Sequence, residues 1–154
     1  MSLKDECEML RRVPLFANIS AAKLKLLAFT SDRVEYQSGQ VLFNQGDHGD
    51  AAYLLLSGSA DILINSPSGE VKVGSVGADD IVGETAILCD VARTATIKTT
   101  TAVVALRIWR DHFLRLLAEF PEISIEIMRM LASRLSLTTA DLTEARSQLK
   151  QLAK

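Results

Sequence analysis

The chain has 154 residues, of which 48% are hydrophobic and 23% charged, and its formal net charge is −2. This composition is typical of one soluble globular domain. It excludes an intrinsically disordered chain and gives no electrostatic basis for broad binding to nucleic acid or to anionic membranes. No apolar stretch approaches the roughly 20 residues that span a membrane, and the N-terminus lacks a signal peptide's apolar core, so we expect a cytoplasmic protein. Cys7 and Cys89 are the only cysteines, which indicates neither a disulfide framework nor a zinc site.

Residues 1–30 are predicted to form a helical entry. Helical spacing is interrupted at Pro14, and Ser20 is a favourable N-cap for a second helix. Residues 31–109 contain eight short strand-like runs separated by turn-forming segments. This pattern predicts a mainly β fold, an antiparallel β-roll of jelly-roll type (a double-stranded β-helix), flanked by helices. A single helical turn is expected in the segment GETAIL, which lies between two of the strands.

Residues 110–154 return to helical spacing, and Pro121 separates a first helix from a long one at about 121–152. Two apolar stripes are expected on the long helix. The first, which we call the seam, has the 3,4 spacing of a coiled coil over nearly four heptads: Met128, Leu131, Leu135, Thr138, Leu142, Ala145, Leu149 and Leu152. The second is expected to pack on the β-roll: Ile123, Ile127, Met130 and Leu137.

The seam predicts a homodimer through the C-terminal helix. Asp141 and Arg146 have the spacing that pairs across a parallel two-stranded coil, which supports this orientation. The alternative is an amphipathic helix that packs only on its own domain.

The segment GETAILCDVARTATI places Glu84 and Arg93 in a run of small and apolar residues. A buried charge is costly without a partner, so the two either pair with each other or hold a ligand between them. Gly83 permits close approach of a ligand, and the following turn offers backbone N–H groups at Thr85 and Ala86 beside the guanidinium, which forms a seat for an anion. Glu84 would then accept from hydroxyls or amines, which indicates a nucleotide or a sugar phosphate. On these residues alone, both alternatives remain open.

The same segment resembles the phosphate-binding cassette of the cyclic nucleotide-binding domain family. The matching positions are Gly83, Glu84, Ala86, Arg93, Thr94 and Ala95. The segment NQGDHGDAAYLLLSGSADIL is similar to the family's glycine turn and following strand, VPLFANIS to its helical entry, and the last 45 residues to its B and C helices. The resemblance implies one domain over residues 1–154 that binds cAMP or cGMP, with no cofactor and no metal.

The resemblance also implies roles for individual residues. Glu84 would accept from the ribose 2′-hydroxyl, and Arg93 would bind the cyclic phosphate together with the backbone N–H of Ala86. Thr94 lies where some members, more often those responsive to cGMP, present a hydroxyl to the phosphate and the guanine amine; it is equally an ordinary strand residue. Thr138 and Thr139 resemble adjacent hydroxyl residues that bond adenine, one from each subunit, whereas Thr138 could instead only set the register of a coil.

Ile62 and Val73 are apolar candidates for the base pocket, with core packing as the alternative. The chain departs from the family pattern at Val82, Thr85 and Ala92, which replace an aromatic residue, a Leu or Met, and a Pro. These departures leave Glu84 and Arg93 intact, so they affect the expected affinity more than the ability to bind.

The expected function is a regulatory or sensor domain in which ligand capture repositions the C-terminal helix. No nucleophile elbow, HExxH motif or P-loop is present in the sequence, so we do not expect an enzyme. One alternative is a dimerisation or scaffold module of the same fold that does not bind ligand. Another is a truncated transcription regulator: the sequence ends before a helix-turn-helix, so no DNA binding is expected of this chain alone, nor any membrane partner. The sequence does not indicate a downstream effector.

Overall fold

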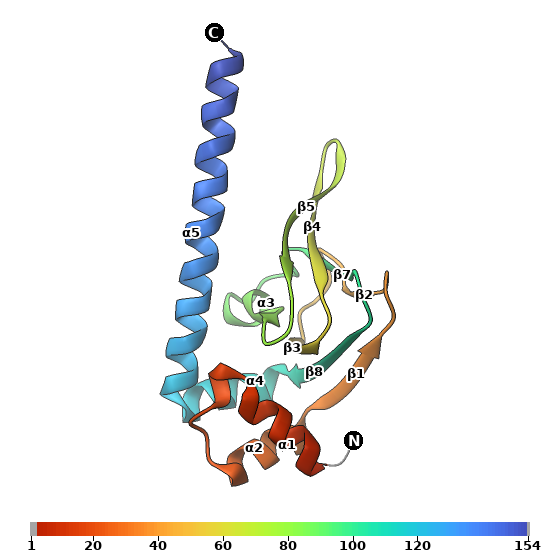
Figure 1. The fold of residues 1–154 in the computed structure, drawn as a ribbon, viewed down its shortest axis with the longest axis vertical. Helices are drawn as coiled ribbons and strands as arrows, with labels where there is room; N and C mark the ends of the chain where they lie inside the picture. Colours follow the sequence, from red (N-terminus) through yellow and green to blue (C-terminus); the bar gives the residue numbers. More distant parts are fainter. Residues whose placement is uncertain (1–2, 154) are drawn as a thin grey trace. The chain divides into compact units, whose positions relative to one another are not determined.

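The computed structural model describes residues 3–153, so the outermost residues of the predicted domain, 1, 2 and 154, lie outside it. The chain divides into two compact units, Met1–Arg115 and Leu116–Lys154. The first holds the N-terminal helices and both sheets, and the second holds the long C-terminal helix (Figure 1).

The N-terminal helices begin and end where the sequence predicts. Helix α1 spans Leu3–Arg12, the 3₁₀ turn η1 spans Pro14–Phe16, and α2 spans Ala21–Thr30. Pro14 is the first residue of η1, because its fixed φ suits a helical start and its missing N–H cannot continue a helix. Ser20 is the N-cap of α2, but its hydroxyl makes no capping hydrogen bond; its backbone carbonyl accepts from Lys23 at 3.1 Å.

Eight strands form two four-stranded antiparallel sheets within the described residues, and these strands fall on the eight runs predicted from the sequence. One sheet has the order β1-β8-β3-β6 and the other β2-β7-β4-β5. The strands are β1 Asp32–Tyr36, β2 Val41–Phe43, β3 Ala51–Ser57, β4 Ala60–Ser66, β5 Gly69–Val76, β6 Ile81–Val82, β7 Thr96–Thr99 and β8 Val103–Trp109. The predicted β-roll is confirmed.

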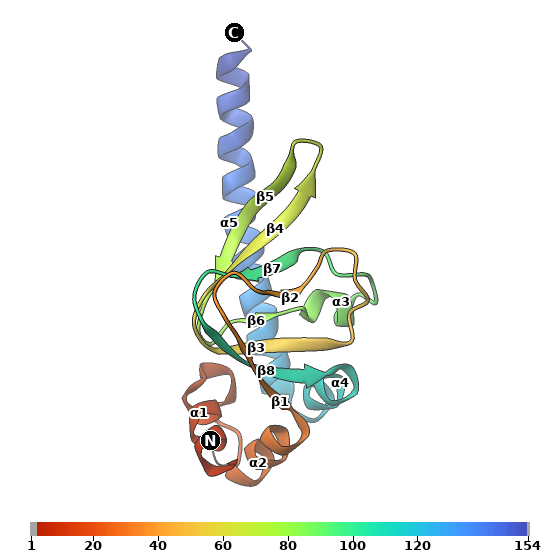
Figure 2. The same cartoon turned by 90° about the vertical axis from the view of Figure 1, so that its right-hand side faces the viewer.

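The core of the roll comes from alternate residues of facing strands. Tyr53 and Leu55 of β3 are buried, as are Val103 and Ala105 of β8, in the period of two that places side chains on one face of a strand; Leu55 pairs directly with Ala105. Partly buried side chains pack at the margin of this core: Val34, Tyr36, Phe43, Ile62 and Trp109. The hairpin of β4 and β5 projects from the roll on the side away from α1 and α2 (Figure 2).

Two short elements lead out of the sheets. Helix α3, Glu84–Leu88, is the helical turn expected in GETAIL, and it follows β6 through Gly83, which has the left-handed φ of 84°. Helix α4, Arg110–Glu119, follows β8 without a loop.

The turn between β1 and β2 is tied to β7 by Thr99. This buried side chain donates to the carbonyl of Gln37 at 2.6 Å and accepts from the backbone N–H of Gln40 at 3.0 Å. Its own backbone N–H donates to the carbonyl of Gln40 at 2.8 Å. One hydroxyl therefore satisfies two backbone groups of the turn.

The second unit is dominated by helix α5, Pro121–Leu152. On the predicted seam, Leu135 is 67% exposed, and Met128, Leu142, Leu149 and Leu152 are also exposed. Of the predicted second stripe, Ile123 and Ile127 are buried, whereas Leu137 is exposed. None of the helices in residues 3–153 combines the length and apolar character that a membrane span requires.

We predict that Thr99→Val destabilises the fold by about 1–3 kcal/mol, because the isosteric change removes a buried hydroxyl and leaves the partly buried N–H of Gln40 and carbonyl of Gln37 without this partner. Urea unfolding followed by circular dichroism measures the effect. Thr100→Val is the matched control, since Thr100 is exposed and its hydroxyl bonds with another hydroxyl, that of Ser59, at 2.7 Å. If the two variants lose equal amounts of stability, the Thr99 hydroxyl does not stabilise the turn between β1 and β2.

Candidate ligand-binding site

Arg93 lies in the loop between α3 and β7, and its backbone is hydrogen-bonded to the glycine turn between β2 and β3. Its N–H donates to the carbonyl of Asp47 at 2.8 Å, and its carbonyl accepts from the N–H of Gly46 at 2.8 Å. The glycine turn and the cassette, two segments that the sequence analysis relates to one family separately, therefore form one local structure.

The side chain of Arg93 is 3% exposed. Its Nη1 donates to the carbonyl of Gly83 at 3.0 Å, and its Nη2 donates to the carbonyl of Ala51 at 2.7 Å. The guanidinium carbon lies 4.0 Å from the centroid of the Phe43 ring. The remaining nitrogen, Nε, is buried and has no hydrogen-bond partner among the described residues.

Burial lowers the pKa of Arg93 from its ordinary value, because the charged form loses its hydration. Tyr53 and the carboxylates of Asp50, Asp47 and Glu84 act in the opposite direction and raise this pKa. Since a guanidinium stays protonated in proteins, the site holds a buried cation whose Nε–H donor is unused. An anion is the ligand that would satisfy both the charge and the donor.

Two glycines permit close packing around this guanidinium, Gly83 against the guanidinium itself and Gly49 against Ala86. A Cβ at Gly83 would lie 2.5 Å from Nη1 of Arg93 and 3.3 Å from the Phe43 ring. A Cβ at Gly49 would collide with Ala86 and lie 3.5 Å from both Cζ and Nε of Arg93. Sequence analysis included Gly83 in the site but missed Gly49 and Phe43. The resemblance of the glycine-turn segment was the signal for Gly49; nothing in the sequence pointed to Phe43.

Glu84 is the first residue of α3 and is 3% exposed. Ala86 is buried beside it and Thr85 is half-buried. Glu84 contributes to the charges that act on Arg93, but Asp50 and Asp47 contribute more. The structure therefore brings Glu84 and Arg93 into one region, and the predicted division between ribose and phosphate stays a prediction.

The other predicted residues occupy different surroundings. Thr94 is exposed and Ala95 is buried at the start of the run into β7. Ile62 of β4 packs against the core cluster, which fits the alternative of core packing, whereas Val73 of β5 is 52% exposed.

Thr138 and Thr139 belong to α5 in the second unit and are exposed. The carbonyl of Thr139 accepts from the Thr143 hydroxyl at 2.8 Å. Their predicted contact with a base stays a prediction.

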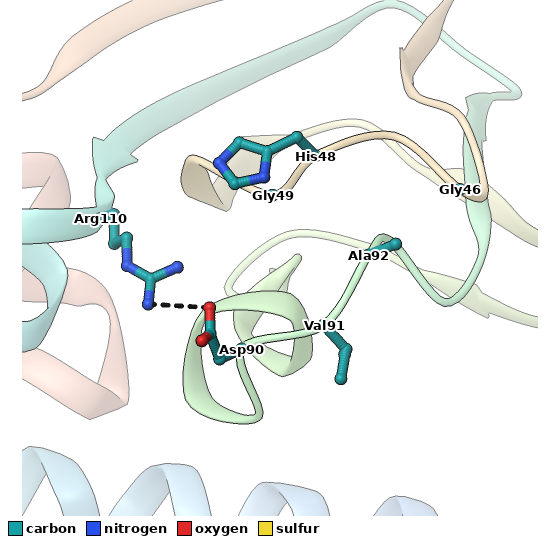
Figure 3. Close-up of a pocket in the computed structure, with 7 residues that line it drawn as sticks. All are labelled: Gly46, His48, Gly49, Asp90, Val91, Ala92 and Arg110. Atoms are coloured by element: carbon teal, nitrogen blue, oxygen red, sulfur yellow. Dashed lines mark hydrogen bonds and ion pairs between the residues drawn. The ribbon is translucent and has the colours of Figure 1, made fainter.

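A pocket of about 320 Å³ lies between the glycine turn and the end of the cassette (Figure 3). None of the residues predicted for the ligand site lines this pocket, which is bordered by Gly46, His48, Gly49, Asp90, Val91, Ala92 and Arg110. Arg110, the first residue of α4, donates from Nη2 to Asp90 Oδ1 at 3.2 Å, and its backbone N–H donates to the carbonyl of Asp50 at 2.8 Å. These bonds join the start of α4 to both walls of the pocket.

Metal ligation has no geometric support in residues 3–153, where no group of three or more His, Cys, Asp or Glu side chains is placed to hold an ion. Cys7 is half-buried and Cys89 is exposed, and both are free thiols.

The structure combines an antiparallel roll, a short helix after Gly83 and a buried arginine beside the glycine turn. A family model described as "Cyclic nucleotide-binding domain" matches residues 33–120, which is more than half of the chain. The chain belongs to the cyclic nucleotide-binding domain family.

Individual relatives agree with this membership. The chain is 30% identical over 138 residues to the CRP-like cAMP-activated global transcriptional regulator of Mycobacterium tuberculosis, a match covering 89% of this chain and 62% of the regulator. It is 38% identical over 114 residues to a cAMP-dependent protein kinase regulatory subunit of Aspergillus niger, covering 74% of this chain and 27% of that subunit. The chain therefore spans less than two thirds of either relative.

Among solved structures, the regulatory subunit of a cAMP-independent protein kinase A from Trypanosoma brucei matches with a TM-score of 0.71 and 26% identity. The match covers 85% of this chain and 48% of that one.

We predict that Gly83→Ala costs about 2–4 kcal/mol of stability, because the alanine backbone must adopt a left-handed φ and its methyl group must also displace Nη1 of Arg93. Gly69→Ala measures the cost of the positive φ alone: Gly69 also has a positive φ of 110°, but nothing lies within 4 Å of its Cβ position. Thermal and urea unfolding of both variants measure the difference. A Gly83→Ala variant no less stable than Gly69→Ala would show that the guanidinium does not lie against this backbone.

Proposed function

We propose that this chain is a regulatory domain that binds a cyclic nucleoside monophosphate, cAMP or cGMP, and that Arg93 binds the cyclic phosphate. The observation that carries the proposal is the buried guanidinium with its unpartnered Nε. A charge-assisted hydrogen bond to an anion is stronger than a neutral one, and stronger still where water is excluded.

In this proposal the cassette divides the ligand between two groups. The backbone N–H of Ala86 joins Arg93 at the phosphate, and Glu84 accepts from the ribose 2′-hydroxyl. Gly83 lets the backbone approach the ligand, with Thr85, Thr94 and Ala95 completing the cassette. A carboxylate is suited to the hydroxyl because it accepts only, whereas it would repel the phosphate.

The base is assigned to other elements. Ile62 and Val73 of the roll and Thr138 and Thr139 of α5 are the proposed contacts. Two named relatives concern cAMP, which favours adenine, and the hydroxyl at Thr94 favours guanine; both nucleotides therefore belong in the binding test.

The proposed output is a change in the C-terminal helix. Ligand capture at the cassette repositions α5, and the exposed seam of α5 holds a second copy of the chain. A ligand can shift such an equilibrium only by its difference in affinity for the two states. We propose a binding role without catalysis, because the family model describes a binding domain and the two named relatives are a transcriptional regulator and a kinase regulatory subunit.

A second candidate is a module of the same fold that dimerises without binding a cyclic nucleotide. The relative from Trypanosoma brucei, whose kinase is described as cAMP-independent, favours keeping this alternative. A further candidate is one part of a longer transcription regulator, since the chain spans 62% of the Mycobacterium tuberculosis protein. DNA binding would then depend on sequence beyond this chain.

We predict that Arg93→Ala weakens cyclic nucleotide binding by at least about 30-fold, since losing one member of a buried charge pair costs about 2–5 kcal/mol. Isothermal titration calorimetry with cAMP and with cGMP measures the loss, and circular dichroism checks that the fold persists. Arg33→Ala is the control, because Arg33 pairs with the exposed Glu35 at 3.1 Å on β1. Unchanged affinity in Arg93→Ala would overturn the cassette assignment; no binding by the wild type would favour the scaffold.

We predict that Leu142→Glu abolishes dimer formation, because it places a charge at the centre of the exposed seam. Sedimentation equilibrium of wild type and variant measures the molar mass. Ser147→Glu adds the same charge to α5 away from the seam and should leave the dimer intact. A monomeric wild type would contradict the proposed homodimer.

A further inference from the structure

The bulge in β2 places Phe43 in an unusual position. Val41 pairs with Lys98 and Phe43 with Ile97, so β2 contains one residue more than β7 over this stretch. Adjacent residues of a regular strand point to opposite faces, and a bulge re-aims a side chain. As a result, both Leu42 and Phe43 pack with the core cluster of the roll.

The Phe43 ring has two partners. Its centroid is 4.0 Å from the guanidinium carbon of Arg93, well inside the range of a cation–π contact. Its centroid is also 5.7 Å from that of Tyr53, with the ring planes tilted by 37°. Tyr53 is buried on β3, so Phe43 packs against a ring that belongs to the core of the roll.

The contacts of Arg93 divide into two kinds. The carbonyls of Gly83 and Ala51 hold its two terminal nitrogens, and its guanidinium carbon lies over the Phe43 ring. These contacts hold the group in place and leave Nε as the nitrogen without a partner in the described part of the chain. A flexible side chain ordered before binding loses less entropy when the ligand arrives.

We propose that Phe43 is a positioning residue for Arg93: its ring, supported by Tyr53, holds the guanidinium in the orientation that presents Nε to an anionic phosphate. This inference rests on the proposed function, because it concerns the affinity of the same site. Phe43 itself does not touch the phosphate. It acts through the arginine, so the ring and not only its volume is required.

The test compares affinities for cAMP and cGMP, by calorimetry, among wild type and four variants. Phe43→Leu and Phe43→Met remove the ring while keeping most of the apolar volume, and the second serves if the first does not fold. Phe43→Tyr keeps the ring. Leu42→Ala is the matched control, since it damages the same strand and the same core cluster without touching Arg93.

Loss of the ring should weaken binding about ten-fold, within the range of cation–π contacts. Phe43→Tyr and Leu42→Ala should stay within about three-fold of wild type, although Leu42→Ala is the less stable protein. We therefore expect the variants that lack the aromatic ring to lose affinity, whether or not they are the least stable variants.

Three results would overturn the inference. If the wild type binds and Phe43→Leu or Phe43→Met binds equally well, Phe43 does not position Arg93. If Leu42→Ala or Phe43→Tyr loses as much affinity as Phe43→Leu, packing explains the effect. If the wild type binds neither nucleotide, the proposed function itself fails, and the inference fails with it.

Discussion

The buried guanidinium of Arg93 is the constraint on which the rest of the site depends. A cation removed from water must be compensated by polar groups, and here two backbone carbonyls, an aromatic face and nearby carboxylates contribute to the compensation. Those carbonyls belong to Gly83, before α3, and Ala51, at the start of β3. The arginine therefore holds the cassette against the roll, and any ligand that binds Nε is connected to both sheets through it.

This arrangement gives glycine a specific purpose at two positions. At Gly83 the guanidinium approaches the backbone so closely that a methyl group would not fit, and at Gly49 a methyl group would collide with Ala86 of the cassette. The cassette and the glycine turn are distant in sequence, yet the backbone hydrogen bonds of Arg93 to Asp47 and Gly46 join them. These hydrogen bonds thus join two loops into one local structure.

The sequence was sufficient to predict the eight strands, the short helix in GETAIL and the break at Pro121, because period, turn residues and proline act locally. Glu84 and Arg93 could also be predicted to lie together, since isolated charges in an apolar run need a partner. The position of Phe43 could not be predicted, because it depends on a bulge whose register is set by β7. The carbonyl acceptors of Arg93 could not be predicted either, because every residue carries a carbonyl and only tertiary structure selects one.

We propose that Nε of Arg93 donates a hydrogen bond to the phosphate of a bound cyclic nucleotide. A crystal structure of the chain grown with cAMP or cGMP measures this directly. We expect a phosphate oxygen about 2.7–3.2 Å from Nε, with the bonds from Nη1 to Gly83 and from Nη2 to Ala51 retained. A bound nucleotide whose phosphate lies elsewhere, with Nε bonded to Glu84 or still without a partner, would contradict the account.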